Sequence, residues 1–61
     1  MIEWFVKLNG TYLAEDAMGW VKDADKAETF GRDIDAMVRM SGIASRMGRR
    51  EGDFDITYRH K

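Results

Sequence analysis

Residues 2–13 read IEWFVKLNGTYL, and this stretch decides the fold. Apolar residues stand at every even position from Ile2 to Leu8, and the alternation ends at Asn9-Gly10. Asn-Gly between alternating apolar residues is the strongest local signal for two antiparallel strands joined by a two-residue turn. The stretch therefore predicts a β-hairpin at the start of the chain.

The turn also determines which side chains share a face of the sheet. It pairs Leu8 with Thr11, and the preceding residues follow in step as far as Phe5 with Ala14. Directly opposed residues lie on the same face. One face then carries the more apolar set Trp4, Val6, Leu8 and Leu13, and the other carries Phe5, Lys7, Tyr12 and Ala14. We expect the first face to form the core and the second to expose two aromatic rings, unless residues 15–20 or a second copy cover Phe5.

A short helical turn is expected after the hairpin. Residues 20–22 either end the second strand or form a further short one. Asp23 or Asp25 then suits the cap of a helical turn over residues 26–30, because its carboxylate can accept hydrogen bonds from free backbone N–H groups. Gly31 is expected to end this turn.

The next stretch has the apolar spacing of an amphipathic helix. It begins at Asp33, a suitable N-cap, and is expected to run to Met47 and to end at Gly48. Its apolar face consists of Ala36, Met37, Met40, Ile43, Ala44 and Met47. Gly42 lies inside the helix and costs about 1 kcal/mol relative to alanine, so the helix either tolerates it or stops and restarts there. We expect one continuous helix whose apolar face packs on the hairpin.

Residues 53–59 alternate again and predict a last strand, in which Phe54, Ile56 and Tyr58 face the core. This strand is expected to pair antiparallel with the first. The chain is thus expected to be a single α+β domain over residues 1–61. A small three-stranded antiparallel sheet is covered on one face by one main helix, in the order strand, strand, short helical turn, helix, strand. The two open edges of such a sheet invite partners.

Composition excludes several kinds of chemistry. The chain has no cysteine, which excludes disulfides and thiolate metal sites. Its one histidine, His60, lies next to the last residue, where chains usually fray. The glycines match no phosphate-binding motif. We therefore expect no enzymatic activity, no cofactor and no metal site.

Charge and hydropathy give further expectations. The formal net charge of −1 points to neither nucleic acid nor a membrane surface. No apolar run approaches the roughly 20 residues of a membrane span, and the first residues lack the pattern of a signal peptide. We expect a cytoplasmic protein without a membrane partner.

Arginines form the best organised polar set. Arg32, Arg39 and Arg46 are seven residues apart, Arg50 follows four residues later, and Arg49 is adjacent. Guanidinium groups bind oxyanions in bidentate fashion, so on a continuous helix this row is suited to phosphates or to an acidic protein surface. The alternative is a solvated helix flank whose aliphatic stems cover the edge of the core. Together with the outer face of the hairpin, the candidate partner-binding residues are Phe5, Lys7, Tyr12, Arg32, Arg39, Arg46, Arg49 and Arg50.

The first two thirds of the chain also carry a resemblance. The run WFVKLNGTYL, followed by Gly19-Trp20-Val21, by Ala27 and Phe30 and by an amphipathic helix, resembles short orphan proteins of bacteriophages and mobile elements. Many of these open with a hairpin of the pattern x-V-K-x-N-G-x-Y-L. The resemblance extends over residues 2–40 and implies a protein that binds and inhibits a host protein or protein complex, of the anti-CRISPR or anti-restriction kind.

We therefore expect a non-enzymatic, phage-type inhibitor in the host cytoplasm. Two alternatives stay open at this point. One is a small nucleic-acid-binding module that uses the same arginines against phosphates. The other is a homodimer with a structural or assembly role, joined through its sheet edges.

Overall fold

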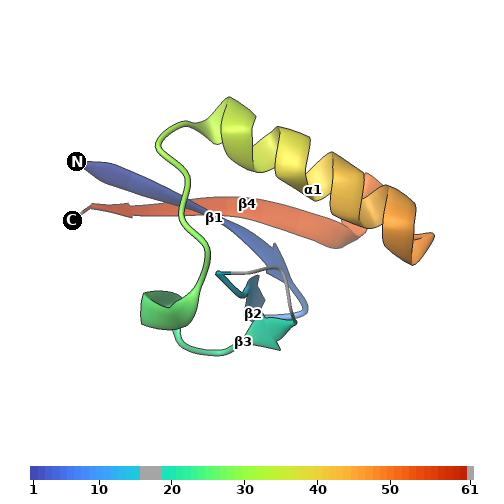
Figure 1. Cartoon of the computed structure of the whole chain (residues 1–61), viewed down its shortest axis with the longest axis horizontal. Coiled ribbons are helices and arrows are strands. Elements are labelled where there is room, and N and C mark those ends of the chain that lie inside the picture. The colour runs from blue at the N-terminus through green and yellow to red at the C-terminus, as the bar shows by residue number, and fades with distance from the viewer. Residues whose placement is uncertain (16–18, 61) are drawn as a thin grey trace.

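The computed structural model describes residues 1–15 and 19–60, and its antiparallel sheet carries one long helix on one face (Figure 1). The strands are β1 (Ile2–Leu8), β2 (Thr11–Leu13), β3 (Trp20–Val21) and β4 (Phe54–His60), and the helix is α1 (Asp33–Met47). Short 3-10 turns precede the helix and the last strand, η1 (Ala24–Lys26) and η2 (Glu51–Asp53). The strand order is β3-β2-β1-β4. The predicted α+β class is confirmed, with four strands rather than three because β3 pairs with β2.

The hairpin turn adopts the conformation that Asn-Gly favours. Asn9 and Gly10 have φ angles of 52° and 80°, in the left-handed region that a two-residue hairpin turn requires. The predicted register at the turn, Leu8 with Thr11 and the pair before it, is confirmed. The Thr11 hydroxyl also donates a hydrogen bond to the Leu8 carbonyl at 2.6 Å, which holds the turn closed.

Past these two pairs β1 and β2 separate, and the stretch that follows η1 enters the space between them. Ala27 pairs with Ala14, which lies just after β2, and Phe30 pairs with Trp4 of β1. Trp4 and Phe30 exchange two backbone hydrogen bonds of 2.9 and 3.0 Å. The predicted pairing of Phe5 with Ala14 is therefore wrong, because a different part of the chain takes that place.

The helix has the predicted bounds and runs through Gly42 without a break. Its N-cap residue is Arg32, one position before the predicted cap, and the Asp33 carboxylate accepts a hydrogen bond from the Ile34 amide at 2.8 Å. Gly48 ends the helix as predicted. Its φ angle of 67° is left-handed, and its amide donates to carbonyls of the last turn.

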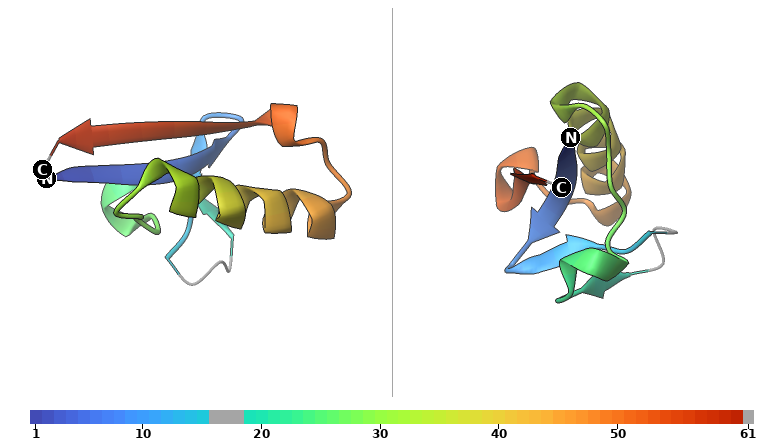
Figure 2. Two further views of the ribbon diagram at one scale, coloured as in Figure 1. Left: turned by 90° about the horizontal axis from the view of Figure 1, so that it is seen from above. Right: turned by 90° about the vertical axis from the view of Figure 1, so that its left-hand side faces the viewer.

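The main core lies between the sheet and α1. Its buried members are Val6, Leu8, Leu13, Ala36, Met40, Ile43, Ala44 and Phe54, and Trp4, Trp20, Phe30 and Ile56 pack around them. The prediction that Met37, Met47 and Tyr58 belong to this core is wrong, because these residues are 50%, 44% and 55% exposed. Met37 lies on a flank of α1 and Met47 is its last residue. Tyr58 lies near the end of β4, which extends past the start of α1 (Figure 2).

The opposite face of the sheet holds a second, smaller core around Phe5. This ring was expected to be exposed, but Phe5 is only 2% exposed. Its centroid lies 5.3 Å from that of Tyr12, and the Arg59 guanidinium lies 5.2 Å away on the same ring. An ion pair between Arg59 and Asp25 brings η1 over this face, and Ala27 just after η1 is buried outside the main core. The separation of β1 from β2 thus explains why the prediction for Phe5 is wrong.

The last strand pairs antiparallel with β1 along its whole length, as predicted. The register runs from Ile2 with His60 to Leu8 with Phe54. His60 was expected to fray, but it belongs to β4, and its ring lies 5.9 Å from that of Tyr58. The strand therefore stays ordered to the end of the described residues.

Candidate functional site

The aromatic side chains that were predicted to be exposed on the hairpin pack against each other instead. Phe5 is buried, and Tyr12 is half-buried with its ring edge-on to Phe5. The Lys7 ammonium lies 5.1 Å from the centroid of the Tyr12 ring, at the distance of a cation–π contact. The structure brings the three side chains together as the register predicted, but Phe5 is closed to a partner.

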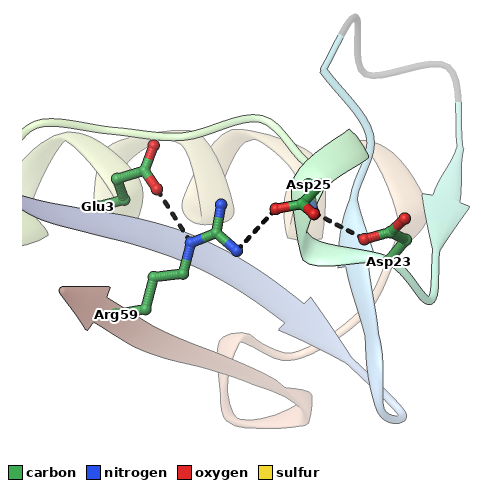
Figure 3. Close-up of polar contacts among 4 residues, drawn as sticks. All are labelled: Glu3, Asp23, Asp25 and Arg59. Carbon is green, nitrogen blue, oxygen red and sulfur yellow. Dashed lines mark hydrogen bonds and ion pairs between the residues drawn. The ribbon is translucent and has the colours of Figure 1, made fainter. Parts of the chain in front are cut away.

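Arg59 forms the best defined polar contacts of the molecule (Figure 3). Its Nε donates a hydrogen bond to Glu3 of β1 at 2.9 Å, and its Nη1 lies 3.0 Å from the Asp25 carboxylate of η1. Asp25 is itself held, because its amide donates to the carboxylate of Asp23, the N-cap of η1, at 2.9 Å. These contacts join β4, β1 and η1 on the face that carries Phe5. Asp23 was one of the two predicted caps, but the predicted bounds of the turn are wrong: it occupies Ala24–Lys26, and Ala27 and Phe30 form β-bridges instead.

The same contacts fix the charge of Arg59. The hydrogen bond to Glu3, and then the one to Asp25, raise the pKa of the guanidinium above its usual value. The group is therefore charged at every pH at which a protein of this kind is folded. Its geometry and its position over the Phe5 ring show a structural role, which the sequence did not reveal because Glu3 and Arg59 are 56 residues apart.

The first two arginines of the predicted row are paired within the chain. Arg32 lies 3.7 Å from Asp35, and its side chain is 74% exposed. Arg39 faces Glu28, with 3.4 Å between Nε and Oε1. Both of these atoms are buried and neither has a hydrogen-bond partner among the described residues, so the ion pair is the contact that compensates their burial. Arg39 thus ties α1 to the stretch between β1 and β2.

The last three arginines lie at the other end of α1. Because the helix ends at Met47, Arg49 and Arg50 leave the predicted line, and the expectation of a row that includes Arg50 is wrong. Arg49 lies 3.8 Å from Asp53. Arg46 and Arg50 are exposed, and among the described residues neither has an ion-pair partner.

An exposed apolar surface on α1 escaped the sequence analysis. Ile34, Met37 and Val38 are 55%, 50% and 68% exposed, and their i, i+3, i+4 spacing places them on one side of the helix. We call these three residues the apolar flank. Arg39 lies on the opposite flank, where it meets Glu28, so the apolar flank lies on the side of β4. The spacing was visible in the sequence, but only Met37 was noted, and it was assigned to the core.

The free edge of β4 lies beside this apolar flank. Strand β4 is at the end of the sheet, and among the described residues it pairs only with β1. Trp4 directs its backbone groups to Phe30, so it forms a non-hydrogen-bonded pair with Tyr58 across β1 and β4. The N–H and C=O of Tyr58, and by alternation those of Ile56, therefore point to the free edge.

The described part of the chain contains no group of three or more His, Asp or Glu side chains that could hold a metal ion. No helix in it has the length and apolar character needed to cross a membrane. Comparisons of the chain with protein-family models, with curated proteins and with solved structures gave no significant match.

Proposed function

We propose that this protein is a non-enzymatic binding domain that inhibits a host protein complex by occupying a surface which that complex needs. One observation carries the proposal: Arg46 and Arg50 are exposed at the same end of α1, and no carboxylate of the described residues pairs with them. Three of the five predicted arginines have a carboxylate within 4 Å in the same chain, whereas these two have none among the described residues.

The chemistry of guanidinium favours an acidic protein surface. Arginine is weakly hydrated and binds carboxylates in bidentate fashion, so it loses less than lysine on entering an interface. Arginine is also enriched among the residues that dominate interface energies. The overall charge of −1 speaks against nucleic acid as the partner, because domains that bind nucleic acid usually carry a basic excess.

The resemblance of residues 2–40 to short phage proteins supports a host complex as the target. Proteins of that type commonly bind a host protein and block it, which requires a folded surface rather than a catalytic group. Phe5 is no longer part of the proposed surface, because it is buried. Lys7 and Tyr12 lie on a different face and stay secondary candidates.

A capture experiment with charge-reversed variants tests this function. The tagged protein, the Arg46→Glu/Arg50→Glu variant and a matched Lys22→Glu/Lys26→Glu variant are incubated with bacterial lysate, with and without nuclease. The control changes the net charge by the same amount, at two exposed lysines that are distant in sequence from Arg46 and Arg50. Bound proteins are identified by mass spectrometry.

We expect a discrete complex that resists nuclease and is captured by the wild type and by the lysine control, but not by the arginine variant. Equal capture by all three proteins would refute the assignment of Arg46 and Arg50. Recovery that disappears with nuclease would favour nucleic acid. In that case, binding should also weaken with salt by roughly one logarithmic unit per tenfold rise in salt for each phosphate contact.

A further inference from the structure

Strand β4 presents a long edge whose backbone groups have no partner strand in the described structure. It has seven residues, whereas β3 at the other end of the sheet has two. Exposed edges of this length tend to pair with another strand unless charge, proline or a bulge blocks them. The chain has no proline, and the register between β1 and β4 runs without a bulge. Strand β4 does carry the charges of Asp55 and Arg59, so this edge is suited to a further strand only where the opposing side chains carry complementary charges.

The side chains of β4 are complementary to those of a second β4 in antiparallel orientation. Thr57 is the middle residue of the strand. If a two-fold axis passes through Thr57, Asp55 of one copy lies opposite Arg59 of the other, and Ile56 lies opposite Tyr58. Opposite charges and apolar pairs in directly opposed positions stabilise antiparallel strands. A strand that is complementary to itself about its own centre is what a two-fold interface requires.

The charges on the Phe5 face continue this pattern across both sheets. Glu3 lies opposite Arg59 in the present structure, and Asp55 lies opposite Lys7. With the second copy in place, one row across the joined sheet reads Glu3, Arg59, Asp55 of the second copy and Lys7 of the second copy, so the sign alternates at every step. Asp55 is exposed and has no ion pair among the described residues, so it is available for this contact.

The backbone permits the same register. The amide and carbonyl groups of Ile56 and Tyr58 point to the free edge, because those of Trp4 point away from β4. Ile56 of one copy and Tyr58 of the other then exchange both hydrogen bonds, and Thr57 faces its own copy as a non-hydrogen-bonded pair. The two-fold axis is perpendicular to the sheet, so both helices lie on the same face and their apolar flanks face each other across the new seam.

We propose that this protein forms a two-fold dimer in which β4 pairs with β4 of a second copy about Thr57, joining the two sheets into one. The interface accounts for the exposure of Tyr58, which would lie opposite Ile56 of the second copy. The dimer does not depend on the proposed host target, because none of the contacts that define it involves Arg46 or Arg50.

Sedimentation of the wild type and of one variant tests the dimer, and cross-linking of a second variant tests its register. Sedimentation equilibrium of the wild type should show a dimer whose fraction rises with concentration. Asp55→Arg places an arginine opposite Arg59 of the second copy and should weaken association at least tenfold. It breaks no ion pair of the single chain, but it also faces Lys7 across β1, so the circular dichroism spectrum is recorded beside that of the wild type to verify that the fold is kept.

Thr57→Cys introduces the only thiol of the chain. A non-hydrogen-bonded antiparallel pair brings two Cα atoms to about 4.5 Å, which is within the range of a disulfide. Under mild oxidation Thr57→Cys should cross-link at least tenfold faster than the control Thr29→Cys, which carries its thiol on an exposed residue outside the seam. A wild type that stays monomeric up to about 1 mM would overturn the proposal, because even a millimolar dissociation constant would show there. Equal cross-linking of the two cysteine variants would overturn the register.

Discussion

Replacing Phe5 by leucine tests whether the second core around this ring supports the fold. Phe5 is 2% exposed and contacts Tyr12 and Arg59, so a leucine at this position leaves unfilled space beside both side chains. Partial truncation of a buried aromatic residue is expected to cost about 1–2 kcal/mol, and full truncation to alanine about 3–5 kcal/mol. A chain of 61 residues is stable by only about 3–9 kcal/mol in total. Leucine is therefore the informative substitution, because the alanine variant would be largely unfolded.

Urea denaturation followed by tryptophan fluorescence gives the measurement. A protein of this size has a denaturant slope near 1 kcal/mol per molar urea, so Phe5→Leu should lower the midpoint by about 1–2 M. The matched control is Tyr58→Leu, an aromatic residue that is 55% exposed. Studied at low micromolar concentration, it should cost no more than about 0.5–1 kcal/mol, because its ring loses a contact with Trp4 at a centroid distance of 5.0 Å. A cost for Phe5→Leu no larger than that of Tyr58→Leu would refute the burial of Phe5.

Three further predictions concern the helix and the ion pairs. Gly42→Ala should raise the free energy of unfolding by about 1 kcal/mol, because a Cβ there meets no atom within 4 Å, whereas Gly48→Ala should lower it by about 1–2 kcal/mol because its φ of 67° disfavours side chains. Both are measured by urea denaturation, and equal signs would contradict the helix end at Gly48. Arg39→Glu should destabilise by about 1–2 kcal/mol by facing Glu28, and Glu28→Arg in the same chain should restore most of the loss; additive losses would show that the contact is unimportant. Arg59→Gln should lower the urea midpoint, and its effect should shrink in an Asp25→Asn background. Because the pKa of Arg59 is raised, its contribution should persist at neutral pH and be lost only in strong alkali; a loss between pH 7 and 9 would contradict this.

Local signals in the sequence predicted most of the secondary structure. Asn9-Gly10 determines the turn because both residues accept left-handed φ angles, and Gly48 ends the helix for the same reason. The alternation after η2 predicted β4 and its place beside β1. These features depend on residues that are close in sequence, or on the burial of one apolar face against another.

The failures all involve contacts between distant parts of the chain. Nothing near Phe5 in sequence indicates that the stretch after η1 separates β1 from β2, or that Arg59 lies over the Phe5 ring. Helical spacing placed Met37 with the apolar residues of α1, but a helix packed on a sheet buries a narrower stripe than its apolar residues span. Likewise, spacing aligned the arginines, but only the structure shows that Arg39 is paired with Glu28 and that Arg46 and Arg50 have no such partner in residues 1–15 and 19–60.

Amide hydrogen exchange along β4 tests most directly whether the free edge of this strand pairs with a second copy of the chain. The amides of Ile56 and Tyr58 point to the free edge, and that of Thr57 points to β1 and serves as an internal reference. We predict that at about 1 mM the amides of Ile56 and Tyr58 exchange slowly, and that on dilution to low micromolar concentration they become fast while Thr57 stays protected. Fast exchange of Ile56 and Tyr58 at both concentrations, beside a protected Thr57, would contradict the pairing of this edge with a second copy.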